Sequence, residues 1–151
     1  MGVGHVQFFG KGLSIVCDRE GVTPFSLDQA IPREYREEFY FSPGEFLEEL
    51  DYLKSLIRPK GRPFLRFCDG ELSLESGARD GSTTIHLEGQ STIELGFDVQ
   101  YMIEALKQFE KEQRVKMKVS GPFSPFVLEA EGRNDYALVL PARLRQANAA
   151  A

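Results

Sequence analysis

The sequence contains few of the side chains from which metal sites, disulfide frameworks and common catalytic centres are built. It has two cysteines and two histidines in 151 residues. Cys17 and Cys68 lie inside apolar strand patterns without Cys-x-x-Cys or Cys-His spacing, which is typical of reduced, buried thiols in a cytosol. His5 and His86 are far apart, and no Gly-x-Ser-x-Gly, phosphate-loop or His-Glu-x-x-His motif occurs. The sequence therefore predicts no enzyme activity, no cofactor and no metal.

Long apolar runs and an excess of positive charge are also missing. The sequence has no stretch of about 18 apolar residues and no apolar N-terminal run of signal-peptide length. We therefore expect a soluble, cytoplasmic protein without a membrane partner. A net charge of -5 and a pI near 5.1 disfavour a general nucleic-acid binder, although they allow a local basic face.

What the sequence does contain is an internal repeat. Adding 56 to positions 42, 46, 47, 50 and 53 gives 98, 102, 103, 106 and 109, where residues of matching kind recur. Each copy has an aromatic strand end, a capping residue, an amphipathic helix and then alternating strands. This predicts an α+β domain built from a duplicated β-α-β-β-β unit, with two helices packed on one side of an antiparallel sheet that both copies form.

In the first copy, residues 38–41 are a predicted strand and Ser42 is the predicted N-cap of a helix, with Glu45 completing a capping box. The apolar residues of this helix recur at helical spacing and form one stripe. They are Phe46, Leu47, Leu50, Leu53, Leu56 and Ile57. The strands expected after the helix cover residues 64–68, 72–74 and 83–87.

In the second copy, Asp98 is the predicted N-cap. The residues expected to face the core from this helix and its end are Val99, Met102, Ile103, Leu106 and Phe109. The strands expected after it cover residues 115–119, 126–130 and 136–140.

The N-terminal part has strand patterns but no helix of its own. Residues 5–9 and 13–17 read as a hairpin, and residues 22–27 as a third strand that Pro24 confines to an edge. Unpaired apolar strands associate, so we expect them to pair with the domain's own sheet or with a second chain in a homo-oligomer. The predicted parts of the chain are residues 1–32, the duplicated domain at 33–145 and a flexible tail at 146–151.

Several segments of the second copy carry a family resemblance. They are the helix entry Gly-Phe-Asp-Val-Gln-Tyr at 96–101, the basic-apolar strand at 114–120, the turn Gly-Pro-x-Ser-Pro at 121–125 and the ending Tyr-Ala-Leu-Val-Leu-Pro-Ala-Arg-Leu at 136–144. Together they resemble the C-terminal domain of the bacterial sliding clamp, the beta subunit of DNA polymerase III. Residues 6–32 resemble the end of the clamp's middle domain and its linker, except that Pro-Phe-Ser-Leu stands at 24–27 where the family has Phe-Pro-Asp-Tyr.

The resemblance implies a DNA-clamp fold and a non-enzymatic processivity factor that encircles duplex DNA. Such clamps hold DNA polymerase and repair proteins through short Gln-Leu-x-Leu-Phe-like peptides. The residues that match the family's peptide groove are Leu138, Val139, Leu140, Pro141, Ala142, Arg143 and Leu144. An apolar strand end followed by proline can line a pocket for an extended peptide, with Arg143 as a charged donor at the rim. Alternatively, Leu138 and Leu140 are core residues.

The resemblance also places the helices toward DNA, where cations must lie near phosphates. The candidate DNA-facing residues are Lys54, Arg58, Lys60, Arg62, Lys107 and Lys111. The alternative is a solvated face with i,i+3 or i,i+4 ion pairs. The first helix also carries Glu45, Glu48, Glu49 and Asp51. This acidity leaves a second function open, a clamp-like interaction or oligomerisation domain of a non-replicative protein such as a transcription regulator.

Overall fold

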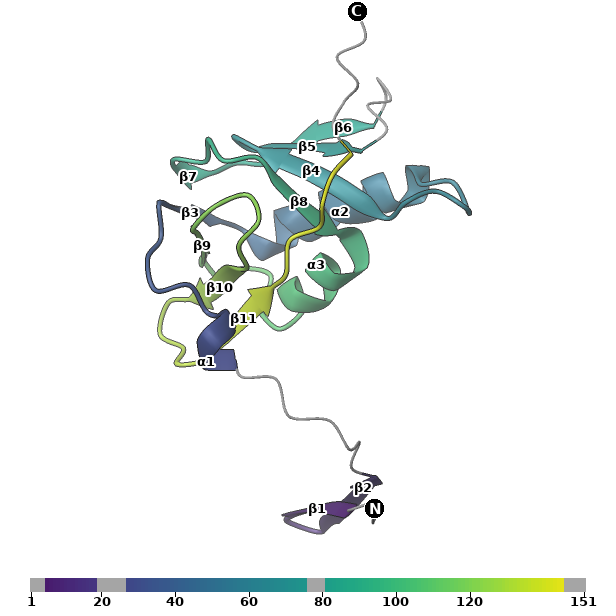
Figure 1. The fold of residues 1–151 in the computed structure, drawn as a ribbon, viewed down its shortest axis with the longest axis vertical. Helices are drawn as coiled ribbons and strands as arrows, with labels where there is room; N and C mark the ends of the chain where they lie inside the picture. Colours follow the sequence, from purple (N-terminus) through teal and green to yellow (C-terminus); the bar gives the residue numbers. More distant parts are fainter. Residues whose placement is uncertain (1–4, 19–26, 76–80, 146–151) are drawn as a thin grey trace, which may run out of the picture.

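The computed structural model describes residues 5–18, 27–75 and 81–145 (Figure 1). The chain begins with β1 (His5–Gly10), β2 (Leu13–Asp18) and the short helix α1 (Leu27–Ala30). The first copy of the repeat comprises β3 (Glu37–Phe41), α2 (Pro43–Leu56), β4 (Phe64–Cys68), β5 (Glu71–Leu74) and β6 (Ser82–Thr84). After β7 (Glu88–Gly89), the second copy comprises β8 (Leu95–Asp98), α3 (Val99–Leu106), β9 (Val115–Val119), β10 (Phe126–Ala130) and β11 (Tyr136–Val139). None of the described helices is long and apolar enough to cross a membrane.

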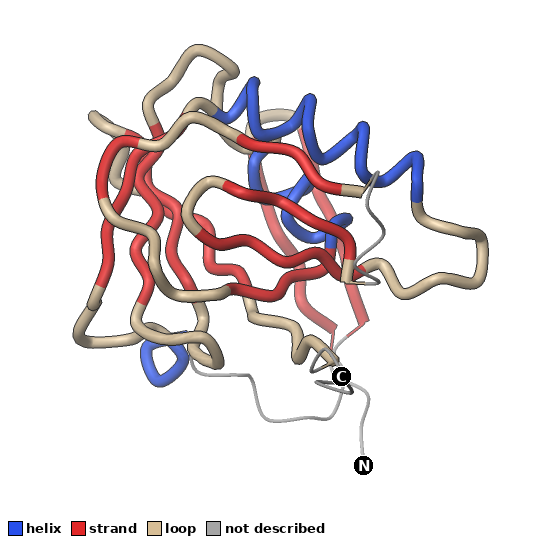
Figure 2. The backbone as a smooth tube through the Cα atoms, turned by 90° about the horizontal axis from the view of Figure 1, so that it is seen from above, coloured by secondary structure: helices blue, strands red, loops and turns tan. Residues whose placement is uncertain are grey.

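The predicted α+β fold and its duplication are confirmed. Helices α2 and α3 begin at Pro43 and Val99, at the offset of the sequence repeat, and they lie together at one side of the strands (Figure 2). Strands β3 to β11 form two antiparallel sheets, whereas the sequence predicts one. The five-stranded sheet has the order β11-β10-β9-β3-β7 and the four-stranded sheet has the order β6-β5-β4-β8.

The two copies exchange their first strands. Strand β3 opens the first copy but pairs with β9 of the second copy, with Phe39 opposite Met117. Strand β8 opens the second copy but pairs with β4 of the first copy, with Leu65 opposite Phe97. Each sheet therefore contains strands of both copies, so neither copy can complete its sheet alone.

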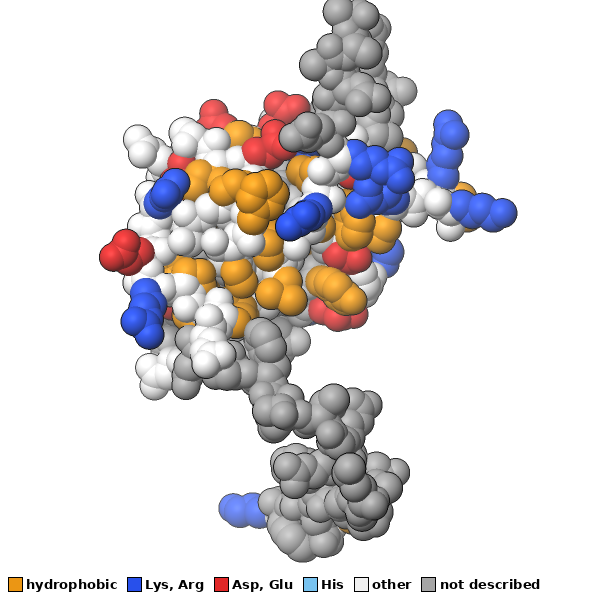
Figure 3. Space-filling model, in the orientation of Figure 1, with side chains coloured by type: hydrophobic (Ala, Val, Ile, Leu, Met, Phe, Trp, Pro, Cys, Tyr) orange, Lys and Arg blue, Asp and Glu red, His pale blue; other side chains and the backbone are white. Residues whose placement is uncertain are grey.

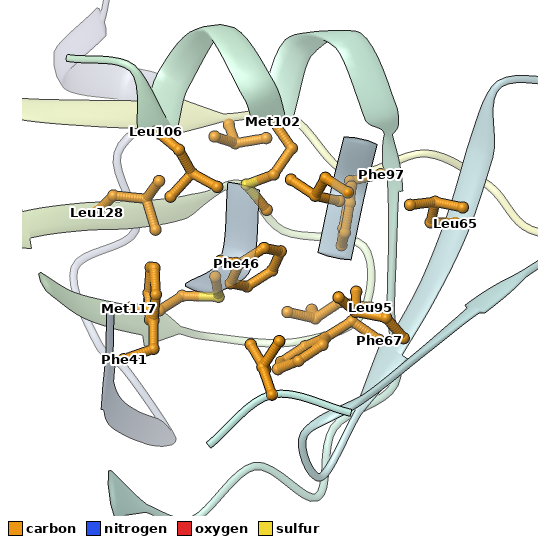
Figure 4. Close-up of a cluster of buried hydrophobic side chains, with 14 of the residues drawn as sticks. Phe41, Phe46, Leu65, Phe67, Leu95, Phe97, Met102, Leu106, Met117 and Leu128 are labelled. Atoms are coloured by element: carbon orange, nitrogen blue, oxygen red, sulfur yellow. The ribbon is translucent and has the colours of Figure 1, made fainter. Parts of the chain in front are cut away.

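The core is continuous between the two sheets and the two helices (Figure 4). Phe46 of α2 lies at its centre, with ring centroids 5.1 Å from Phe41, 5.7 Å from Phe67 and 6.3 Å from Phe97. Each aromatic pair of this kind contributes about 0.5–1.5 kcal/mol beyond the burial of its area. Because these rings come from β3, α2, β4 and β8, they fix the helix against both sheets.

The two helix caps differ. The Asp98 carboxylate accepts hydrogen bonds from the backbone N–H groups of Gln100 and Tyr101 at 2.8 and 3.2 Å, which confirms the predicted cap. Ser42 makes no side-chain hydrogen bond to its own helix and instead donates to the carbonyl oxygen of Lys111. The predicted capping box is wrong because Glu45 accepts the backbone N–H of His86 at 3.0 Å rather than that of the cap.

Several other predicted boundaries shift. Leu56 is exposed at the end of the stripe, and Cys68 is only half-buried. The strand expected at 83–87 is β6, which ends at Thr84, and the chain then crosses to the other sheet as β7. Of the strand expected at 22–27, residues 22–26 lie outside the described residues and Leu27 begins α1. The expected tail at 146–151 also lies outside them.

Candidate functional site

The end of the chain crosses from one sheet to the other. After β11 ends at Val139, the chain runs past α3 toward β4 and β5 (Figure 1). We call residues 141–145 the C-terminal strap. One backbone hydrogen bond joins the strap to the four-stranded sheet, from the N–H of Ala142 to the carbonyl oxygen of Gly96 at 2.8 Å.

A glycine makes this crossing possible. Gly96 pairs with Arg66 in the register of β8 and β4, while their neighbours Leu65 and Phe97 point into the core, so Gly96 faces outward. A Cβ atom at position 96 would lie 2.5 Å from the carbonyl oxygen of Ala142 and 2.5 Å from Cγ of Leu144. Because real Cβ atoms do not approach that closely, the strap fits only over a residue without a side chain.

Side chains of the first copy hold the strap from the other side. Arg62 Nη2 donates to the carbonyl oxygen of Arg143 at 3.3 Å, and Arg66 Nη2 donates to that of Arg145 at 2.5 Å. The backbone N–H of Arg145 donates to Glu75 Oε1 at 2.5 Å. The strap is therefore attached to β4 and to the residues that flank the open end of the β4–β5 hairpin.

The predicted groove residues are brought together along one segment, but their side chains point in different directions. Leu138 is half-buried opposite Val127 on the outer face of the five-stranded sheet. The side chain of Val139 is 4% exposed and belongs to the core, whereas that of Leu140 is 60% exposed. Of the strap residues, Pro141, Ala142 and Leu144 are half-buried and Arg143 is exposed.

Two large apolar residues that the sequence did not single out lie beside this segment. Phe123 is 75% exposed in the turn before β10, whose first residue Phe126 pairs with Val139, so the turn lies next to Leu140. Tyr101 is 65% exposed in the first turn of α3, immediately after the strand that carries Gly96. Figure 3 shows hydrophobic side chains gathered on this face, with Lys and Arg side chains beside them. The signal for Phe123 was its place inside a Gly-Pro-x-Ser-Pro turn, because turns lie at the surface.

Comparison with protein families matches residues 28–143 to the DNA polymerase III beta subunit, C-terminal domain. The chain belongs to this family. A comparison with curated protein sequences gave no match.

Solved sliding-clamp structures share the fold. The chain is similar to clamps from Bacillus subtilis (TM-score 0.69, 20% identity), Pseudomonas aeruginosa (TM-score 0.71, 19% identity) and Bartonella birtlesii, the last bound to griselimycin (TM-score 0.72, 15% identity). The superpositions cover 96%, 95% and 92% of this chain. They cover 40%, 41% and 39% of the clamp chains, so this chain spans about two fifths of a clamp's length.

The cations expected on the DNA side of a clamp do not gather in one place here. Lys54 Nζ donates to the Gln100 side chain at 2.7 Å, which places the late part of α2 beside the start of α3. Arg62 is engaged with the strap, while Arg58 and Lys60 are exposed in the loop after α2. The residues at the other end of the helix pair are Lys107 and Lys111, both exposed, and the Lys111 carbonyl accepts the N–H of Gly44 at the start of α2.

The acidic residues of α2 divide into two pairs. Glu49 accepts the hydroxyl of Thr83 at 2.5 Å and Glu45 accepts the N–H of His86, so this pair ties the helix to β6 and the loop after it. Glu48 and Asp51 are exposed to solvent. Together they outnumber Lys54, the exposed cation of α2, so the exposed surface of the helix has a net negative charge, which opposes a close approach of phosphates.

Cys68 has the environment of a structural thiol rather than of a nucleophile. Burial raises the pKa of the Cys68 thiol, and the nearby carboxylates of Glu94 and Asp69 raise it further. The thiol therefore stays protonated near neutral pH, and a protonated thiol is a poor nucleophile. Within the described residues, no group of His, Cys, Asp and Glu side chains could hold a metal ion.

Proposed function

We propose that this chain is a docking platform for short apolar peptides, the C-terminal part of a replication processivity factor of the sliding-clamp type. The observation that carries the proposal is the position of Phe123, Tyr101 and Leu140. Each is exposed, and all three flank the end of β11 and the strap, whose backbone is held by hydrogen bonds. Large apolar side chains on a fixed backbone are the usual anchors of peptide recognition.

The chemistry of the surface suits an extended partner. The strap is an irregular segment that begins with Pro141, which has no N–H to donate, so recognition rests on apolar contacts and on a few polar groups. The guanidinium of Arg143 is exposed and makes no ion pair with a described residue. It can donate to a carbonyl or carboxylate of the partner. DNA polymerase and repair proteins with Gln-Leu-x-Leu-Phe-like peptides are the partners that the family suggests, in the cytoplasm.

We expect weak binding by the isolated chain. The family's groove has a second wall, and the chain spans only part of a clamp. With part of the apolar burial missing, the dissociation constant for a single peptide should be tens of micromolar or weaker, about -6 kcal/mol.

A peptide titration followed by NMR tests the proposal. A Gln-Leu-x-Leu-Phe peptide should shift the resonances of residues 121–125 and 136–144, and Leu140→Asp, Phe123→Ser or Arg143→Ala should weaken the binding. Leu56→Asp is the matched control, because Leu56 is also an exposed leucine but lies at the end of α2. An absence of shifts at millimolar peptide, or equal losses in the Leu56 and Leu140 variants, would contradict the proposal.

A second candidate function is a clamp-like interaction or oligomerisation module that does not encircle DNA. The observation that favours it is the helix pair, whose predicted DNA-facing cations are divided between two ends while Glu48 and Asp51 are exposed. Binding of duplex DNA distinguishes the two candidate functions. A ring-forming clamp requires that the helices tolerate DNA phosphates, whereas the second candidate does not.

The homo-oligomer stays a prediction, and it depends on how the hairpin of β1 and β2 pairs. Strands β1 and β2 pair with each other, from His5 opposite Asp18 to Gly10 opposite Leu13, and with no other described strand. The predicted alternative in which these strands pair with the domain's own sheet is therefore wrong for β1 and β2. An isolated two-stranded hairpin is marginally stable, so we expect it to pair with a second chain. Light scattering at increasing concentration measures this, and a monomer at all concentrations would contradict association between copies.

A further inference from the structure

We propose that Glu75, Arg62 and Arg66 are positioning residues that hold the strap in the arrangement that partner peptides bind. The inference rests on the proposed function, because it assigns a role in peptide binding to residues that would act through the strap rather than by touching the peptide. It concerns the end of the chain, where sequence separations of 70 to 81 residues are bridged by side chains.

Glu75 is the centre of this arrangement. Its side chain is 8% exposed, and Oε1 accepts both Nη1 of Arg62 at 3.1 Å and the backbone N–H of Arg145 at 2.5 Å. A nearly buried carboxylate is costly unless its oxygens are paired. The two partners of Glu75 therefore depend on each other. Loss of the strap would leave the carboxylate without the N–H of Arg145, and loss of Arg62 would leave the negative charge of the carboxylate unbalanced.

The two arginines are themselves held in place. The Cζ atom of Arg62 lies 4.7 Å from the ring centroid of Phe64, which keeps the guanidinium on the outer face of β4. Arg66 Nη1 is paired with Glu94 Oε1 at 2.6 Å, which leaves its Nη2 directed to the carbonyl oxygen of Arg145. Both donors are thus held by contacts that do not involve the strap.

The strap needs this support because regular pairing ends before it. Strand β11 ends at Val139, and between Val139 and Arg145 one backbone hydrogen bond joins the strap to a sheet, from Ala142 to Gly96. Without the side-chain bonds the segment that follows Leu140 would sample many conformations. A peptide would then have to order it on binding, which lowers the apparent affinity in proportion to the population of the competent arrangement.

The test uses the 151-residue chain in four versions with changes at the strap. Glu75→Ala removes the central carboxylate, and Glu75→Gln keeps an acceptor for the N–H of Arg145 but not the charge. Gly96→Ala displaces the strap without changing any charge, because the added Cβ would overlap Ala142 and Leu144. Arg66→Ala removes the second arginine. The matched control is Glu129→Ala, which breaks the Lys118–Glu129 ion pair at 3.2 Å on the outer face of the other sheet.

Two readouts are measured on each version, amide hydrogen exchange at Ala142 and Arg145 and the affinity for the Gln-Leu-x-Leu-Phe peptide. For Glu75→Ala, Arg66→Ala and Gly96→Ala we expect exchange at these amides to become about tenfold faster and peptide affinity to fall about three- to tenfold, while exchange in β9 and β10 stays unchanged. Glu75→Gln should lie between the unaltered chain and Glu75→Ala, and Glu129→Ala should leave both readouts unchanged.

The two proposals fail in different ways. If the unaltered chain binds no peptide, the proposed function is overturned, and so is the role of the strap in it, although the exchange data still decide whether Glu75 anchors the strap. If the chain binds peptide but the strap amides keep their protection in Glu75→Ala and Gly96→Ala, the anchoring is overturned. If those amides become exposed and affinity does not change, the positioning role is overturned while peptide binding stands.

Discussion

Tyr40 and Gly96 occupy equivalent places in the two copies of the fold. Each lies in the strand before a helix, and each faces outward from its sheet, opposite Lys116 and Arg66 respectively. The ring of Tyr40 lies under the guanidinium of Arg114, with 3.8 Å from Cζ to the ring centroid. Gly96 has no side chain, and the C-terminal strap lies over it instead. The duplication is therefore symmetric in its core and differs at its outer faces, where the candidate site lies.

The pair of helix caps allows a comparison at equivalent positions. Asp98→Ala removes an acceptor of two backbone N–H groups and should lower the free energy of unfolding by about 1 kcal/mol. Ser42→Ala should cost less than about 0.5 kcal/mol, because the Ser42 side chain makes no bond to its own helix. Urea denaturation of both variants measures the difference. A cost below about 0.5 kcal/mol for Asp98→Ala would show that the Asp98 bonds do not contribute to stability.

The helix stripe can be tested with two leucines. Leu106 is fully buried in the core, so Leu106→Ala should lower the free energy of unfolding by about 2–5 kcal/mol through lost burial and a residual cavity. Leu140→Ala removes the same atoms from an exposed site and should change it by about 0.5 kcal/mol or less. Denaturation midpoints compare the two, and a loss well under 1 kcal/mol for Leu106→Ala would contradict its place in the core.

The helices and strands of this fold could be predicted from the sequence because they depend on local patterns. The spacing of Met102, Ile103 and Leu106 predicts the α3 stripe, and the alternation of Val115 and Met117 predicts the inner face of β9. The pairing of the strands could not be predicted from the sequence. Nothing local shows that Phe39 lies opposite Met117 rather than beside the strands of its own copy, so one sheet was expected and two formed.

The candidate site could be predicted only in part, because some of its contacts join residues that are far apart in the sequence. The strand end at 138–144 was located through its resemblance to a clamp, but Val139 points into the core because side chains alternate across a strand. Glu75 and Arg62 meet the strap through contacts that span at least 70 residues. The sequence alone therefore groups Arg62 with the cations expected near DNA, and no local pattern indicates a role for Glu75.

Glu37 should make stability depend on pH. Burial by itself raises the pKa of this carboxyl, but hydrogen bonds from the Thr92 hydroxyl and from the N–H groups of Ile93 and Thr92 outweigh burial and hold the pKa below its ordinary value of 4.5. A pKa that is lower in the folded state contributes stability that is present above pH 4.5 and is lost as the pH falls through the folded pKa. The chain should therefore become less stable on acidification in that window.

Two variants identify the Glu37 contribution. Glu37→Gln removes the titrating group, so the difference in stability between it and the unaltered chain should shrink as the pH falls from about 6 to about 3. Thr92→Val removes the hydroxyl donor and leaves the backbone donors, so its effect on the pH dependence should be smaller. Urea midpoints across this range are the measurement. Parallel curves for Glu37→Gln and the unaltered chain would show that the Glu37 bonds do not alter its pKa.

The helix surface of this chain should bind duplex DNA weakly unless its charge is changed. Glu48 and Asp51 are exposed on α2, and their replacement by lysine would convert a repulsive surface into an attractive one. We expect the double variant Glu48→Lys with Asp51→Lys to raise the affinity for a short duplex about tenfold at low salt, with a steeper salt dependence because each new phosphate contact releases counterions. The control is Glu129→Lys with Glu131→Lys, which changes the net charge equally but on the outer face of the five-stranded sheet. Fluorescence anisotropy at several salt concentrations compares them. A larger gain for the α2 variant would show that the helix surface can receive DNA in the way a clamp requires, and an equal gain for both variants would show that only net charge had changed.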